Sequence, residues 1–160
     1  MRIRLAFAAG VLAAAAPVAL AAPDALASAL SPVEPGTYEI VNTDGHCLRS
    51  EGAFNSKAPV GACDTRWKVA PSGHDGGFTI THATTGNCLA VALERIYPPL
   101  AATLPCDMTQ GSAWTLADAG DGQVTISLRG SSYLTDMGDN RPTVLLEPRP
   151  EGQHWTLRAM

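Results

Sequence analysis

The amino-acid sequence predicts an all-β domain built from three copies of one repeat of about 40 residues. Three tryptophans, 47 and 41 residues apart, each begin a Trp-x-Val or Trp-x-Leu segment. A Gly-containing turn followed by a Cys-Leu or Tyr-Leu pair precedes each of them in the same order. About four short strands per copy then close into a barrel with pseudo-threefold symmetry, which is a β-trefoil.

Each copy begins with a short segment in which apolar and polar residues alternate: Tyr38–Ile40, Phe78–Ile80 and Val124–Ile126. Alternation with a period of two is typical of a strand with one buried face. The turns that follow contain glycines, which tolerate the positive φ of tight turns; these are Gly45, Gly86 and Gly130.

Each copy ends in a strand that starts at a tryptophan, and these are Trp67, Trp114 and Trp155. Their equivalent placement predicts three large side chains that fill one core, rather than surface aromatics that stack on a ligand. A β-propeller has a similar repeat length but is built from about four to eight blades. Three copies therefore favour the trefoil.

Residues 1–22 have the features of a secretory signal peptide, with Arg2 and Arg4 before an alanine-rich apolar run and Ala19-Leu20-Ala21 as a small-x-small cleavage site. A membrane anchor is the less favoured interpretation, because the run is only weakly hydrophobic. Residues 23–34 are expected to form a short linker and residues 35–160 the trefoil domain. We expect a secreted protein, extracellular or periplasmic, with no membrane span after signal cleavage.

The charge balance argues against nucleic acid as a partner. Without residues 1–22 the chain has 9 Lys and Arg against 15 Asp and Glu, a formal charge of 9 − 15 = −6. Nucleic-acid binding needs a basic stripe or patch, and none is present in the sequence.

Four cysteines in an exported chain predict two disulfides. No two of them have the close spacing of a zinc site, so no metal is expected. Cys47 and Cys63 belong to the first copy, and Cys88 and Cys106 belong to the second, at separations of 16 and 18. We therefore predict the pairs Cys47–Cys63 and Cys88–Cys106, whereas the third copy has Tyr133 and Glu147 at these places.

These features together resemble the ricin B-type lectin family, whose repeat carries Gly-x-Cys-Leu, a second cysteine and a terminal Gln-x-Trp. The resemblance covers about Gly36 to Met160, and it lies in the segments Gly45-His46-Cys47-Leu48, Gly86-Asn87-Cys88-Leu89 and Gln153-His154-Trp155. It implies a non-enzymatic, carbohydrate-binding β-trefoil.

The usual galactose determinants of that family are missing. The resemblance implies an aspartate after Cys-Leu, where this chain has Arg49, Ala90 and Thr135. It also implies a stacking aromatic two residues before the second cysteine, where this chain has Gly61, Leu104 and Leu145. The expected binding residues are instead a shifted polar group in the third copy: Asp136, Asn140 and Gln153.

A β-trefoil protease inhibitor is the alternative function. The longest insertion lies inside the second predicted disulfide, and two prolines stiffen it, which lowers the entropy cost of binding. Its candidate contact residues are Arg95, Ile96, Tyr97 and Pro98. The sequence has no catalytic motif, so neither an enzyme nor a cofactor is expected. The expected partner is a glycan or a secreted or host protein, and the sequence carries no signal for an oligomeric state.

Overall fold

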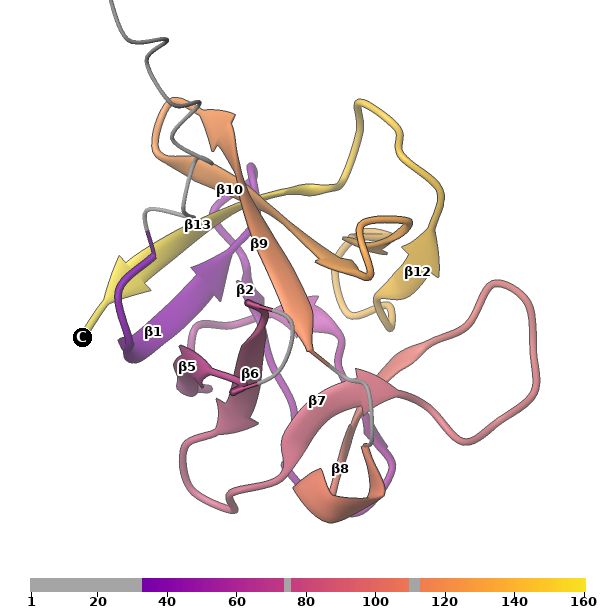
Figure 1. Cartoon of the computed structure of the whole chain (residues 1–160). Coiled ribbons are helices and arrows are strands. Elements are labelled where there is room, and N and C mark those ends of the chain that lie inside the picture. Colours follow the sequence, from indigo (N-terminus) through magenta and orange to yellow (C-terminus); the bar gives the residue numbers. More distant parts are fainter. Residues whose placement is uncertain (1–32, 74–75, 110–112) are drawn as a thin grey trace, which may run out of the picture. The chain divides into compact units, whose positions relative to one another are not determined.

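The structure is a computed structural model that describes residues 33–73, 76–109 and 113–160 (Figure 1). The expected signal peptide, residues 1–22, lies outside the described residues, as does most of the expected linker. Within the described ranges no helix combines the length and the hydropathy needed to span a membrane.

Nearly all regular structure in the described chain is β. Its strands, in chain order, are β1 (Gly36–Val41), β2 (Cys47–Leu48), β3 (Ser56–Lys57), β4 (Val60–Gly61), β5 (Trp67–Pro71), β6 (Phe78–His82), β7 (Cys88–Val91), β8 (Ala101–Leu104), β9 (Trp114–Gly120), β10 (Gln123–Leu128), β11 (Ser132–Thr135), β12 (Val144–Leu146) and β13 (His154–Ala159). One 3₁₀ turn, η1 (Cys106–Met108), follows β8.

Six strands close into a barrel, two from each copy. The antiparallel pairs run in a ring from β1 to β5, β6, β9, β10, β13 and back to β1. The first strand and the tryptophan strand of each copy supply these six strands, so the alternating segments expected from the sequence are confirmed. Closure matters because it leaves no unpaired barrel edge for another chain to join.

Six of the remaining strands form one hairpin per copy: β2 with β4, β7 with β8, and β11 with β12. The last strand, β3, pairs with β8. Three backbone hydrogen bonds link the hairpins in a cycle. Ala58 donates to Ala101, Ala101 donates to Thr143, and Thr143 donates to Ala58, each at 3.0 Å. All three residues are buried, and their cyclic arrangement marks the pseudo-threefold axis expected from the repeat.

The three tryptophans occupy equivalent core positions, as the sequence predicts. Each is fully buried, and each indole N–H donates a hydrogen bond to the carbonyl oxygen of the leucine in its own copy's Cys-Leu or Tyr-Leu pair. These bonds join Trp67 to Leu48, Trp114 to Leu89 and Trp155 to Leu134, at 2.9, 2.9 and 3.1 Å. The tryptophan strand thereby fixes the hairpin that follows the first strand.

Candidate functional site

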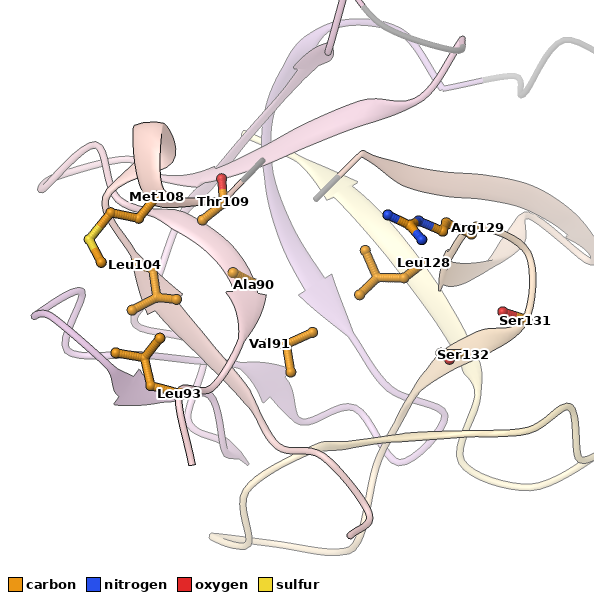
Figure 2. A pocket seen from close by; sticks show the side chains of 10 residues that line it. All are labelled: Ala90, Val91, Leu93, Leu104, Met108, Thr109, Leu128, Arg129, Ser131 and Ser132. Atoms are coloured by element: carbon orange, nitrogen blue, oxygen red, sulfur yellow. The ribbon is translucent and has the colours of Figure 1, made fainter. Parts of the chain in front are cut away.

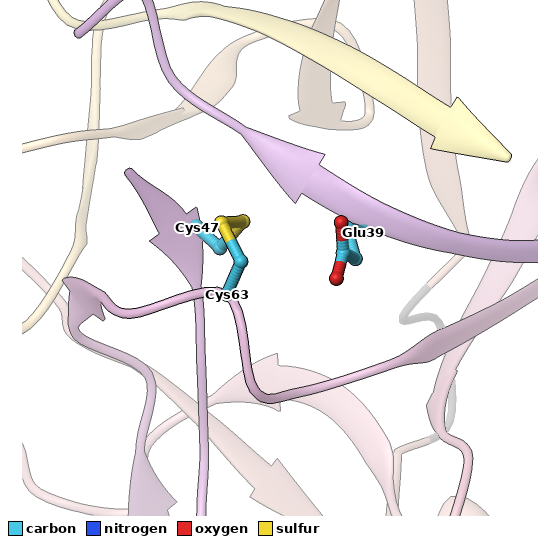
Figure 3. Close-up of side chains that lie close together, drawn as sticks. All are labelled: Glu39, Cys47 and Cys63. Carbon is cyan, nitrogen blue, oxygen red and sulfur yellow. A yellow bond between two sulfur atoms is a disulfide. The ribbon is translucent and has the colours of Figure 1, made fainter. Parts of the chain in front are cut away.

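Both expected disulfides are present in the structure. Cys47–Cys63 has a Cα–Cα distance of 4.8 Å, and Cys88–Cys106 has one of 5.0 Å. Glu39 lies beside the first disulfide, and its carboxylate, Cys47 and Cys63 place three atoms of metal-binding type within 4.8 Å of one another (Figure 3). Metals bind cysteine as the thiolate, which neither oxidised sulfur offers. Glu39 is also paired with Arg158, whose Nε donates at 2.7 Å, so this cluster is structural.

In the first copy, the chain's own side chains fill the position of the family's sugar site. A Cβ added to Gly61 would lie 3.1 Å from Cδ of Arg49 and 3.3 Å from Oδ1 of Asn140. Arg49 is held there by an ion pair with Asp64, at 3.1 Å. The space over Gly61, where the resemblance implies an aromatic side chain, is therefore taken by Arg49 and Asn140.

In the third copy, the equivalent position is closed by a buried hydrogen-bond network. The Thr135 side chain is completely buried, and its hydroxyl accepts a 3.0 Å hydrogen bond from Nε2 of Gln153. Gln153, which is 2% exposed, also donates to the Glu147 carbonyl and accepts from the Arg149 N–H. Both the nitrogen and the oxygen of the Gln153 side-chain amide therefore have hydrogen-bond partners within the fold.

The three polar residues expected to bind ligand differ in burial and in hydrogen-bond partners. Asp136 is half-buried and accepts hydrogen bonds from Asn42 Nδ2 at 2.7 Å and from the Gly138 N–H at 2.8 Å. Asn140 is exposed and lies over Gly61 of the first copy. Because Gln153 is buried, only Asp136 and Asn140 of the expected set reach the surface.

The second copy has an open groove at the corresponding position. Its cavity volume is about 480 Å³, and Ala90 and Leu104, the two residues at the family's sugar-site positions, form part of its lining. Figure 2 shows Val91 between two walls, with Leu93, Leu104 and Met108 on one side and Leu128 with Arg129 on the other. Thr109, Ser131 and Ser132 complete the lining with hydroxyl groups.

This groove joins two copies, because β7 and β8 belong to the second and the Leu128–Ser132 turn belongs to the third. The turn has a hydrogen bond from Ser131 N–H to Leu128 O at 3.2 Å. Both central residues have positive φ, 53° at Arg129 and 66° at Gly130, which is the pattern of a type I′ hairpin turn. The sequence predicts the turn but not its position against the second copy. That position results from closure of the barrel, which brings the third copy beside the second.

The insertion expected as a protein-contact loop projects from the β7–β8 hairpin (Figure 1). Tyr97 is 86% exposed at its tip, and Arg95 and Ile96 are also exposed. The base is fixed by Asn55, whose Oδ1 accepts from the Leu93 N–H and whose Nδ2 donates to Glu94. The loop therefore presents exposed side chains from an anchored base.

An ion pair adds to this anchor. Lys57 Nζ lies 2.5 Å from Oε1 of Glu94. The hydrogen bond from Lys57 is the main reason that the pKa of Glu94 lies below its ordinary value of 4.5, and the Asn55 contact acts in the same direction. Glu94 is therefore ionised at neutral pH.

Comparisons with known proteins agree with this architecture. The designed threefold-symmetric protein ThreeFoil superposes with a TM-score of 0.69 at 18% identity, covering 78% of this chain and 99% of ThreeFoil. The Rhizoctonia solani agglutinin gives 0.67 at 14% identity, covering 80% and 97%. The Macrolepiota procera ricin B-like lectin, solved with lactose, gives 0.65 at 17% identity, covering 80% and 99%. At such identities the likeness is one of fold.

No curated protein matches the sequence. A sequence model of the family described as ricin-type beta-trefoil lectin domain-like matches residues 64–144, just over half of the 160 residues. The matched segment spans the whole second copy and the groove. With the six-stranded barrel, the three hairpins and the three equivalent tryptophans, this match establishes that the chain belongs to the ricin-type β-trefoil lectin domain-like family.

Proposed function

We propose that this protein is an exported, non-enzymatic carbohydrate-binding module whose site is the groove between the second and third copies. The observation that carries the proposal is that a groove lies at Ala90 and Leu104, the family's sugar-site positions. These two side chains are themselves buried, and the at least partly exposed apolar side chains of the lining include Val91, Leu93 and Leu128. The first and third copies close the equivalent space with Arg49 and with the Thr135–Gln153 pair. Two disulfides support export, since such bonds persist in oxidising compartments.

The groove has the chemistry that a sugar ring requires. A pyranose has an apolar face of C–H groups and a rim of hydroxyls, so it needs an apolar floor and a few polar partners. Val91, Leu93 and Leu128 supply apolar surface, while Thr109, Ser131 and Ser132 supply hydroxyls that both donate and accept. The volume of about 480 Å³ lies within the range of small-molecule sites, about 300–1,000 Å³.

A glycan array on the oxidised protein tests this proposal, with binding then compared between two variants. Val91→Trp places a large ring in the middle of the groove and is expected to abolish binding. Asp136→Asn, at the equivalent position of the third-copy hairpin, is expected to leave binding unchanged. If Asp136→Asn lost binding and Val91→Trp retained it, the binding site would lie in the third copy and not in the groove. Absence of any glycan ligand would overturn the proposal.

Protease inhibition through the β7–β8 loop is the second candidate function. It is supported by an anchored base, through Asn55 and the Lys57–Glu94 pair, and by the exposed Arg95, Ile96 and Tyr97, which precede the half-buried Pro98. An inhibitory loop must enter a protease cleft without a large loss of conformational entropy, and a fixed base lowers that cost.

Trypsin inhibition at equimolar dose tests this second function. Arg95 supplies the cationic side chain that a trypsin-like pocket accepts, so Arg95→Ala is expected to remove any inhibition. Arg141→Ala, which changes an exposed arginine elsewhere on the surface, serves as the control. No inhibition of trypsin, subtilisin or papain by the unmodified protein would dismiss this candidate.

A further inference from the structure

Arg129 is a charged side chain with no partner at the edge of the groove. It lines the cavity, and Figure 2 shows its guanidinium group directed from the Leu128 wall toward the opposite wall. Among the described residues, no hydrogen bond or ion pair involves this side chain. An arginine offers five N–H donors in a planar fork that matches a carboxylate or a sulfate.

The remaining lining of the groove is electrically neutral. Of its ten described lining residues, Arg129 is the only one that carries a charge. Two acidic residues are adjacent in sequence to lining residues of the opposite wall: Glu94 follows Leu93 and is paired with Lys57, and Asp107 precedes Met108 in η1. Neither belongs to the lining. The chain as a whole has a net charge of −4. In this groove, however, Arg129 lies beside apolar side chains, and no carboxylate belongs to the lining.

The backbone holds Arg129 at this position. A φ of 53° places it in the left-handed region, which is unusual for a residue other than glycine, asparagine or aspartate. The corresponding turns of the first and second copies have their positive φ at the glycines Gly45 and Gly86. The third copy has its equivalent glycine at Gly130 and, in addition, a positive φ at Arg129, where only glycine would avoid the Cβ strain. The turn directs the Arg129 side chain into the groove (Figure 2).

We propose that the groove selects anionic sugars, with Arg129 binding the carboxylate or sulfate and the apolar floor binding the ring. This inference rests on the proposed carbohydrate-binding function and names the class of sugar. Ser131 lies on the same turn as Arg129, and Ser132 begins β11 directly after it. Their hydroxyls provide donors and acceptors for the ring hydroxyls beside the acid group. Neutral hexoses offer the guanidinium hydroxyl oxygens but no anionic partner.

Matched sugars test this preference on the oxidised full-length protein. The probes are the methyl glycosides of galactose, galacturonic acid and galactose 6-sulfate, together with the corresponding glucose series. Backbone amide shifts of Ser131 and Ser132, followed by NMR during titration, report binding at the groove itself. At low salt, at least one anionic sugar is expected to bind about tenfold or more tightly than its neutral counterpart, the size of one charge-assisted hydrogen bond. The galacturonate and sulfate arms show which anion is preferred.

Two arginine variants supply the control. Arg129→Gln is expected to lower the affinity for the anionic sugar to that of the neutral one, while Arg141→Gln, with the same charge change at another exposed arginine, leaves it unchanged. Added salt is expected to lower the affinity for the anionic sugar and to leave the affinity for the neutral sugar unchanged. Equal binding of neutral and anionic sugars, or equal losses in both variants, would overturn the acid preference while leaving the proposed function intact. Absence of binding by every probe and on a wider glycan array would overturn both.

Discussion

The indole N–H of Trp114 donates a 2.9 Å hydrogen bond to the carbonyl oxygen of Leu89, the residue directly before Ala90 in the lining of the groove. A core side chain of the second copy thus fixes the hairpin that carries the candidate site. The same bond occurs between Trp67 and Leu48 in the first copy, where the groove is filled. The scaffold is therefore common to the copies, and the side chains after the leucine decide whether a site stays open.

Truncation of this tryptophan is expected to destabilise the whole domain. Trp114→Ala removes a fully buried side chain and should lower the free energy of unfolding by about 3–5 kcal/mol. Trp114→Phe retains part of the ring volume but leaves the Leu89 carbonyl without its donor, which costs about 1–3 kcal/mol. Denaturant unfolding of the oxidised protein measures both. Thr115→Ala, at the exposed neighbouring residue, is the control, and a Trp114→Ala effect within about 0.5 kcal/mol, as at surface sites, would contradict the core assignment.

Removal of each disulfide is expected to have a similar effect on stability but a different effect on the groove. The bridges span 16 and 18 residues, so the chain-entropy model gives about 3 kcal/mol for each. Replacing Cys88 and Cys106 with serine also frees η1, which carries Met108 in the groove wall. Glycan binding should therefore weaken in this variant and persist in the Cys47/Cys63 pair variant, as measured by titration under conditions where both remain folded. Equal binding in the two variants would show that η1 does not contribute to the binding site.

Protonation of Glu94 is expected to release the base of the projecting loop. Its pKa is lowered, chiefly by the hydrogen bond from Lys57, so the anchor is intact above the ordinary value of 4.5 and is lost as the pH falls through the lowered folded-state value. An NMR titration of the Glu94 carboxyl from neutral pH into acid gives this midpoint directly. A midpoint above the ordinary value would mean that the ion pair does not form in solution.

A charge-removing variant reproduces this release at neutral pH. Glu94→Gln loses the ion pair with Lys57 and is expected to increase the rate at which trypsin cleaves after Arg95, which mass spectrometry of the fragments measures. Glu151→Gln, at another exposed glutamate, should cleave there at the rate of the unmodified protein. The same rate in both variants would show that the ion pair does not hold the loop.

The scaffold could be predicted from the sequence because its signals are local and repeated. Alternation of apolar and polar residues predicts each barrel strand, and the recurrence of tryptophan in three copies indicates that the copies share one core. The disulfides follow from the same register, since each pair lies within one copy.

The candidate site depends on contacts between copies, which the sequence does not display. Asn140 lies near Asp136 in the chain but packs over Gly61 of the first copy. Arg129 lines a groove with Val91 only because the barrel brings the third copy against the second. One signal was available: residues two apart in an extended strand share a face, so the buried Trp155 predicts that Gln153 also points inward.

Galactose and lactose are not expected to bind in the family's usual way. Each copy lacks the aspartate after Cys-Leu, and a sugar hydroxyl buried without its acceptor costs about 1–3 kcal/mol. Arg49 lies over Gly61 in the first copy, and the Thr135 hydroxyl already accepts from Gln153 in the third. In the second copy, the Ala90 side chain offers no acceptor and the Leu104 side chain no aromatic plane.

Titration calorimetry with both sugars should therefore give no dissociation constant tighter than about 1 mM, which corresponds to about −4 kcal/mol. Lactose serves as the more demanding probe, because its second ring adds contact area without supplying the missing acceptor. Arg49→Ala opens the space over Gly61 but restores neither the carboxylate nor the aromatic, so it should leave this result unchanged. Micromolar binding of galactose by the unmodified protein, abolished by Arg49→Ala or Thr135→Ala, would show that one of the closed positions is the sugar site.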